Sequence, residues 1–189
     1  MASTDLTAFG VNTRSRAPAR HYVLAVLLAF VGGLFGIGGA FVQEMQTGGL
    51  LLLPFVGAPI IEEAMKPLGV YIALIRWHAA LASRLFTACL AGIGGLVFGV
   101  VEALVYTEVY VSDPSDSFVI YRFTAPLIMH TIASFIFGLG ISRGIIDWAA
   151  GRAPFPKRAR NFYIVAVLIH AAFNITAITL HLSGVVDLD

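Results

Sequence analysis

The sequence contains few charged residues and a single cysteine. Charged side chains make up 12% of its 189 residues, about half the share of an ordinary soluble domain, whereas 58% of the residues are hydrophobic. A water-soluble fold cannot bury that much apolar surface, so we expect a lipid bilayer to be the solvent of this chain. The lone Cys89 excludes an intrachain disulfide and a zinc site built from thiolates. Because it lies within an apolar run, we expect it to be a packing residue.

The hydrophobic residues are gathered in runs long enough to cross a membrane, since about 30 Å of hydrocarbon requires roughly 20 helical residues. The first run is too long for a cleavable signal peptide and offers no clean small-residue cleavage site. The sequence therefore predicts an all-α, polytopic membrane protein, in which a mobile basic arm at 1–20 precedes a single transmembrane helical domain at 21–189. Five spans are expected, near residues 22–42, 50–75, 85–107, 119–142 and 162–182.

Lysine and arginine are concentrated in alternate connections between these spans. Since cytoplasmic connections carry the excess of basic residues, this pattern predicts the N-terminus inside and the C-terminus outside. Arg122 is the exception, because it lies at the outer end of the expected fourth span. The short connections fit a multi-pass protein of an inner (cytoplasmic) cell membrane. The lipid bilayer is thus one expected partner, and nucleic acid is not.

Seven ionisable or strongly polar residues lie well inside the expected spans. A charged group at that depth costs at least about 2.5–3.5 kcal/mol on insertion scales, so such groups usually face a cavity and serve a function. Counted at about 1.5 Å of helix per residue, four of the seven fall near one level and favour a single site, whereas Glu102 lies nearer the outer surface. The four are Glu62, His130, His170 and Asn174, and the full set of candidate site residues is Glu62, Glu63, Lys66, Glu102, His130, His170 and Asn174.

The acidic segment of the second span has a helical spacing with a proline on either side. Glu62 and Lys66 are four residues apart and share a helix face, so the ammonium can pair with the carboxylate. Pro59 and Pro67 remove backbone donors and favour a bent or interrupted helix. Such backbone is tolerated at membrane depth where it lines a cavity enclosed by protein. The segment is therefore expected to line a pocket.

Small residues recur at every fourth position in two other spans. Glycine and alanine at this spacing let helices approach closely in lipid, so we interpret both runs as packing faces. The residues are Gly32, Gly36 and Ala40 in the first span, and Gly95 and Gly99 in the third.

The candidate site has three carboxylates against one ammonium, which leaves an excess of two negative charges with the histidines neutral. Apolar surroundings do not hold that excess, so either the carboxylates share protons or a dication lies among them. In the first case a glutamate acts as general base on a water, and His and Asn side chains stabilise the oxyanion. In the second case a zinc-like ion (Zn²⁺) acidifies its bound water. The candidate ligands of that ion are Glu62, Glu102, His130 and His170.

Taken in order, these motifs resemble the PrsW-type intramembrane proteases, which belong to the wider superfamily of CAAX prenyl endopeptidases and bacteriocin-processing or immunity-type membrane proteins. The motifs are "EEAMK" at 62–66, "FGVVE" at 98–102, an isolated His130 in the next span and "HAAFN" at 170–174. The resemblance implies an intramembrane endopeptidase, either of the glutamate type or a zinc metalloprotease. It also implies a membrane-anchored protein substrate, such as an anti-sigma-factor-like regulator.

The resemblance assigns a role to each motif. Glu62 corresponds to the water-activating base and Glu63 to its orienting partner, held by Lys66. His170 and Asn174 correspond to the oxyanion site.

The chain departs from the CAAX branch at two positions. That branch has an arginine one residue beyond Lys66 and a histidine where Glu102 stands. His130 is therefore the candidate for the histidine that helps to hold the nucleophilic water, and a preference for prenylated substrates is not expected.

Two other classes of function remain as alternatives. Chains of carboxylates and histidines also form proton relays in proton- or ion-coupled transporters. Transporters of that kind usually show repeated halves, which this sequence lacks. The second alternative is a non-catalytic, immunity-type membrane partner, which would be indicated by the loss of Glu62 or His170, and both are present.

Overall fold

The structure, a computed structural model, describes residues 17–47 and 56–183 of the chain. Every regular element in these ranges is helical, as the all-α prediction requires. Only residues 17–20 of the expected basic arm fall within them. In chain order the elements are α1 (Ala19–Thr47), α2 (Ala58–Met65), α3 (Leu68–Trp77), α4 (Arg84–Val105), the π-helical turn η3 (Tyr106–Tyr110), α5 (Asp116–Arg122), α6 (Ala125–Gly138), α7 (Arg143–Ala149) and α8 (Lys157–Leu182).

Four segments of the described residues are helical, long and apolar enough to cross a membrane, and they correspond to four of the five expected spans. The remaining expected span, the second in chain order at 50–75, lies outside the described residues up to residue 55. From there on it forms two short helices, α2 and α3. A count of five spans and the predicted sides of the two termini therefore remain predictions. The four segments are Ala19–Gly39, Arg84–Tyr110, Asp116–Gly138 and Lys157–Leu182.

The two prolines of the acidic segment have different roles, and only Pro67 interrupts the helix as predicted. Pro59 lies in the first turn of α2, where a missing N–H breaks no helical hydrogen bond. Pro67 separates α2 from α3, because its ring cannot donate to the carbonyl of Glu63 and clashes with the preceding turn. The predicted interruption is thus confirmed, and Lys66 lies at the break.

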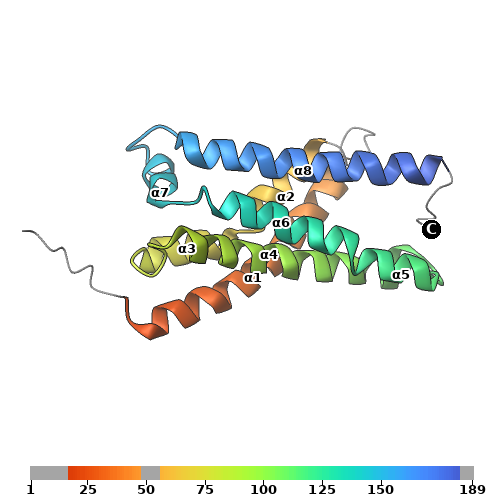
Figure 1. Cartoon of the computed structure of the whole chain (residues 1–189), viewed down its shortest axis with the longest axis horizontal. Helices are drawn as coiled ribbons and strands as arrows, with labels where there is room; N and C mark the ends of the chain where they lie inside the picture. Colours follow the sequence, from red (N-terminus) through yellow and green to blue (C-terminus); the bar gives the residue numbers. More distant parts are fainter. Residues whose placement is uncertain (1–16, 48–55, 184–189) are drawn as a thin grey trace, which may run out of the picture.

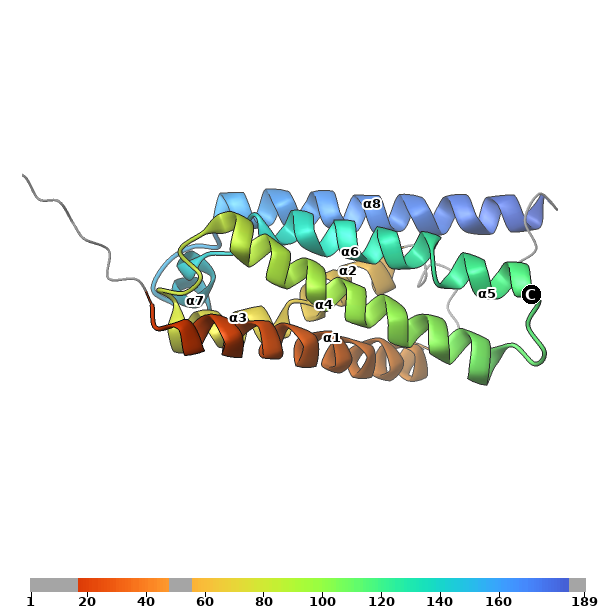
Figure 2. The ribbon, with the colours of Figure 1, turned by 60° about the horizontal axis from the view of Figure 1, so that its bottom comes forward.

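The short helix α2 lies inside the bundle. It contacts α1, α6 and α8, and Figure 2 shows it in the middle of the molecule behind α4. Around it, α4 packs on both α1 and α6, and α6 packs on α8. Figure 1 shows α7 and the start of α8 at one end of the bundle and α5 at the other. The start of α1 with Arg20, the connection between α3 and α4, and the basic residues around α7 share the α7 end.

Glycines let α4 approach its neighbours closely, as the four-residue spacing predicted. A Cβ on Gly95 would lie 2.6 Å from the Ser134 hydroxyl on α6, and one on Gly99 would lie 3.1 Å from the Cα of Leu127. Gly94, which the spacing did not single out, would place a Cβ 2.6 Å from the carbonyl oxygen of Lys66. In α1, Gly32 faces the backbone of α3 in the same way, and a Cβ on Gly36 would lie 3.1 Å from the Phe98 side chain. The side chain of Ala40 lies outside the described part.

The outer faces of the long helices carry exposed hydrophobic side chains, as surfaces in contact with lipid do. On α4 this face includes Leu85 and Leu96, which are 62% and 38% exposed. Cys89 follows Leu85 by one helical turn and is exposed too. Its expected role as a packing residue is therefore wrong, because it does not lie on the buried face of α4, which consists mostly of glycine and alanine.

Replacing Gly95 by alanine should destabilise the fold, because the added methyl group meets α6 at both Ser134 and the backbone of His130. Overpacking of this kind costs about 1–3 kcal/mol. Thermal unfolding of the purified protein in detergent micelles measures the loss. Gly38→Ala is the matched control, because a Cβ there would have no atom of the described residues within 4 Å beyond its own helix. Equal midpoints for the two variants would contradict the close packing of α4 on α6.

Candidate active site

Six of the seven predicted site residues meet in the interior of the bundle. They come from α2, α4, α6 and α8, and all are buried except Glu102, whose side chain is 24% exposed. The outlying level expected for Glu102 was wrong, because the third span continues through η3 and its outer end lies at Tyr110. The six are Glu62, Glu63, Lys66, Glu102, His130 and His170.

The ammonium of Lys66 is fully buried and lies at the centre of this set. Its Nζ donates to Glu63 Oε1 at 2.6 Å and to His130 Nδ1 at 2.7 Å. Glu62 Oε2 lies 3.4 Å away as an ion-pair partner, and the ring of Phe98 covers the ammonium at 4.5 Å. Because a buried charge is costly unless it is paired, Lys66 requires these carboxylates.

Glu63 is completely buried, and both of its carboxylate oxygens have partners. Oε1 accepts from Lys66 and from His170 Nδ1, the latter at 2.9 Å, and Oε2 accepts from the Ser134 hydroxyl at 3.3 Å. Since the carboxylate accepts, Nδ1 of His170 carries the proton and a neutral ring has its lone pair at Nε2. Glu63 therefore fixes the orientation of both Lys66 and His170.

His130 is oriented from both sides by hydrogen bonds. Its Nδ1 accepts from Lys66, so the proton is on Nε2, which donates to Glu102 Oε2 at 2.9 Å. The rings of His130 and His170 meet edge to face with their centres 4.9 Å apart. Both nitrogens of His130 are thus engaged within the protein.

Arg122 extends the polar cluster onto α5, and the sequence reasoning did not include it. Its Nη2 lies 3.0 Å from Glu102 Oε2, although the pair is not aligned as a hydrogen bond, and its guanidinium covers the ring of Tyr106 at 3.7 Å. The signal was present, since Arg122 was the one basic residue that broke the alternation. With two cations against three carboxylates, the excess negative charge is one rather than two.

Ser134 is a second site residue that the sequence reasoning missed. It follows His130 by one turn of α6 and donates to Glu63. A serine in an apolar helix carries little signal, because it commonly bonds to its own backbone. Asn174, one turn beyond His170 on α8, is half-buried.

Two hydrogen-bond acceptors face each other on the remaining side of the cluster. Glu62 Oε2 is buried and has no hydrogen-bond partner among the described residues. His170 Nε2, the nitrogen with the lone pair, lies 3.8 Å from it, beyond hydrogen-bond distance. Two buried acceptors at this separation favour a species between them that donates hydrogen bonds or carries positive charge.

Three of the side chains also match the requirements of a metal site. One ligand atom from each of Glu62, His130 and His170 lies within 4.8 Å of the others. Two imidazoles and a carboxylate are a ligand set of catalytic zinc, with a fourth position left for water. His170 further donates its other ring nitrogen to a carboxylate, as zinc-binding histidines do. The donor set thus fits a zinc-like ion, although His130 would exchange one of its two hydrogen bonds for the metal.

Comparison with known proteins gives one family. The sequence model described as PrsW family intramembrane metalloprotease matches residues 17–187, nearly the whole chain. No curated protein and no solved structure gives a significant match.

Removing either partner of the Arg122–Glu102 pair should destabilise the protein by about 1–3 kcal/mol, because a mostly buried charge loses the opposite charge beside it. Arg122→Met, Glu102→Gln and the double variant form a double-mutant cycle read by thermal unfolding in micelles. The double change should cost less than the sum of the single ones.

The exposed pair of Arg152 and Asp147 provides the control for this cycle. The arginine side chain is 58% exposed there, although the two charged atoms are only 2.7 Å apart. Arg152→Met should therefore cost less than about 1 kcal/mol. Strict additivity of the Arg122 and Glu102 changes would show that the two residues do not interact.

Proposed function

Because the chain belongs to the PrsW family of intramembrane metalloproteases, we propose that it hydrolyses a peptide bond of a membrane-anchored protein at Glu62 and His170. The observation that carries this proposal is the pair of facing acceptors. Glu62 Oε2 and His170 Nε2 lie 3.8 Å apart, and the carboxylate oxygen has no hydrogen-bond partner among the described residues. A water that donates both protons suits such a pair, and it is the second reactant of hydrolysis.

In the proposed reaction Glu62 is the general base. It takes a proton from the water while the water oxygen attacks the carbonyl carbon of the substrate peptide. The tetrahedral intermediate then breaks its C–N bond, and the proton held by Glu62 passes to the leaving amine. The products are a carboxylic acid and an amine, so atoms and charge balance without another reactant.

The other residues of the cluster position this base. Glu63 ties Lys66 to His170, and Lys66 contacts the Glu62 carboxylate, so the four side chains form one unit. His130 on α6 accepts from Lys66, and Glu102 on α4 in turn accepts from His130. For the oxyanion we propose the amide of Asn174, which lies one turn beyond His170 and can donate hydrogen bonds. His170, which the resemblance placed beside Asn174 in this role, has its lone pair at Nε2 and is proposed to hold the water instead.

A metal-assisted version of the same hydrolysis is the second candidate, favoured by the ligand atoms of Glu62, His130 and His170 that lie within 4.8 Å of one another. These three side chains would hold the ion. A zinc-like ion would supply an acidified water and polarise the substrate carbonyl. The roles of Glu63 and Lys66 in orienting His170 and Glu62 are the same in either version.

The proposed substrate is a single-span protein of the same bilayer, of the anti-sigma-factor-like kind that the resemblance implies. The buried position of the cluster between apolar helices supports this class, because a substrate in the membrane can reach such a site sideways. We further propose an inner cell membrane, which the short connections between the expected spans favour.

Glu62→Gln should abolish cleavage and leave folding intact, because the amide keeps the shape of the side chain but cannot accept a proton. The measurement is a census of new protein N-termini in membranes of cells that express the wild type or the variant at equal level. Fragments that appear only with the wild type identify the substrate and the bond that is cut.

The matched control is Glu108→Gln, which makes the same chemical change at an exposed residue of η3. It should give the wild-type fragments. Equal fragments from folded Glu62→Gln would remove Glu62 from the role of base. Absence of any fragment with abundant wild type would favour the transport or partner functions, for which proton flux is the next assay.

If the metal version operates, the purified protein should contain about one zinc-like ion per chain, measured by elemental analysis. His130→Ala and His170→Ala should each lose it, and a chelator should remove both the ion and the activity. His78→Ala, at an exposed residue after α3, should keep the metal. Wild-type protein that is free of metal and still cleaves its substrate would exclude this version.

A further inference from the structure

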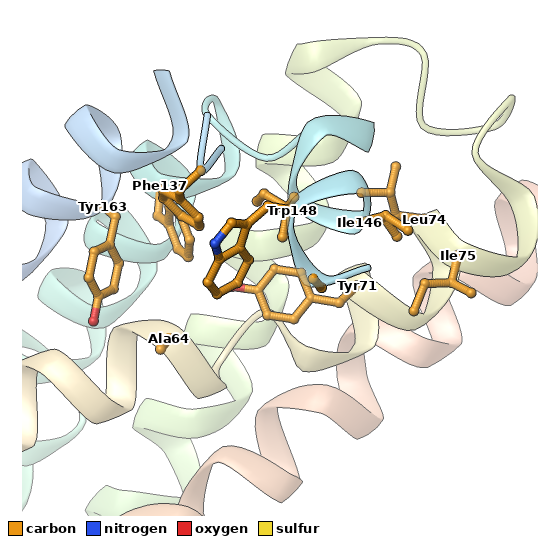
Figure 3. Close-up of a pocket in the computed structure, with 11 residues that line it drawn as sticks. Ala64, Tyr71, Leu74, Ile75, Phe137, Ile146, Trp148 and Tyr163 are labelled. Carbon is orange, nitrogen blue, oxygen red and sulfur yellow. The ribbon is translucent and has the colours of Figure 1, made fainter. Parts of the chain in front are cut away.

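A half-open apolar cavity of about 410 Å³ lies between α2, α3, α6, α7 and α8. Its walls are almost entirely aliphatic and aromatic. Figure 3 shows Ala64, Phe137 and Tyr163 at one end and Leu74 and Ile75 at the other, with Trp148 between them. Ile75 and Trp148 are 61% and 48% exposed, so they mark the mouth, whereas Phe137 is buried.

The inner end of this cavity adjoins the candidate active site on three helices at once. On α2, Ala64 follows Glu63 directly, and on α6 Phe137 follows Ser134 by three residues. On α8, Tyr163 precedes His170 by seven residues, two turns along the same face. The cavity is therefore the next layer of the bundle below the active site, toward the α7 end.

We propose that this cavity is a specificity pocket, which binds a large apolar side chain of the substrate close to the bond that is cut. The inference rests on the proposed function. Steps of three to seven helical residues correspond to roughly 5–10 Å along α6 and α8. An extended peptide covers about 3.3 Å per residue. The bound side chain is therefore two or three residues away from the cleaved bond.

The chemistry of the walls selects the class of side chain. The cavity has almost no polar surface with which to replace the hydration of a charged or amide group, so such side chains are rejected. A Leu, Phe or Met side chain gains about 1.5–3 kcal/mol when it is fully buried. The pocket therefore favours these over alanine or glycine at one position of the substrate.

The cavity is also tied to the helix that carries the carboxylates, which favours the substrate as its occupant over a lipid chain. The Tyr163 hydroxyl donates to the carbonyl oxygen of Ile60 on α2 at 2.6 Å, and its ring is part of the cavity wall. A side chain that contacts Tyr163 is therefore linked through this hydrogen bond to α2, one turn before Glu63. The same hydrogen bond thus joins the wall of the pocket to the helix that carries the proposed base.

The test is to fill the pocket from its α7 wall and record which sequences are still cut. Ala149→Phe places a ring in the cavity, and Ala150→Phe makes the same change at the next exposed residue, which does not line it. Full-length variants are compared with the wild type by the census of new N-termini, and peptides spanning an identified cut are then assayed with purified protein in micelles.

In the substrates cut by the wild type and by Ala150→Phe, one fixed position should be rich in Leu, Phe and Met. This position should lie two or three residues from the cleaved bond. Replacing that residue by alanine in the peptide should lower kcat/KM by about ten- to 200-fold. Ala149→Phe should accept the alanine peptide about as well as the original one. Among the substrates that Ala149→Phe cuts, smaller residues should replace Leu, Phe and Met at that position and at no other.

Three results would overturn the inference. The first is cuts that depend on Glu62 but show no apolar preference at a fixed position. The second is an unchanged preference in folded, active Ala149→Phe, and co-purified phospholipid that is lost only in this variant would then identify a lipid site. The third is the absence of any cut that depends on Glu62, which refutes the proposed function as well. In the first two cases the proposed protease function stands and only the pocket assignment fails.

Discussion

The ammonium of Lys66 is the charge around which the interior of this bundle is organised. It is fully buried, and an unpaired charge in apolar surroundings would cost several kcal/mol, roughly as much as the total stability of many domains. Glu63, His130 and Glu62 surround it and require α2 and α6 to meet at one point. The backbone fits this need, because Pro67 interrupts the helix at Lys66 and Gly94 lets α4 pack directly on its carbonyl.

The asymmetry between the two glutamates follows from this arrangement. Glu63 accepts from three donors, so both of its carboxylate oxygens are engaged and it orients its neighbours. Glu62 Oε2 has the ion pair at 3.4 Å but no hydrogen-bond partner among the described residues. Because His170 donates to Glu63, it turns its lone pair toward that oxygen. Adjacent residues of one helix thus acquire different properties from their partners alone.

The sequence predicted the helical class, the break at Pro67 and the meeting of Glu62, His130 and His170, because each depends on local spacing or on the high cost of polar groups in lipid. The predicted depth of Glu102 was wrong, because η3 continues the helix beyond the expected end of the third span, and hydropathy does not show where such a span ends. The sequence reasoning missed Arg122 and Ser134, whose partners lie on other helices. The exposure of Cys89 depends on the rotation of α4, which small residues on the opposite face determine. Contacts between helices are what sequence patterns specify least.

An intramembrane protease of the PrsW family must reconcile two solvents, since hydrolysis consumes water whereas the substrate arrives through lipid. In this chain the two requirements are separated along the bundle axis. The polar residues occupy one layer, where Glu102 and Arg122 reach the partly exposed side of the cluster. The layer below is almost wholly apolar and opens beside Ile75 and Trp148. A helical substrate has its peptide carbonyls engaged in hydrogen bonds, so it must be extended before a water can attack. A pocket that takes a side chain two or three residues from the cut would favour that extended form. Burial of that side chain in the apolar layer would then supply the free energy for unwinding the substrate helix. The polar layer cannot supply it, because its side chains are already paired with one another and with Lys66.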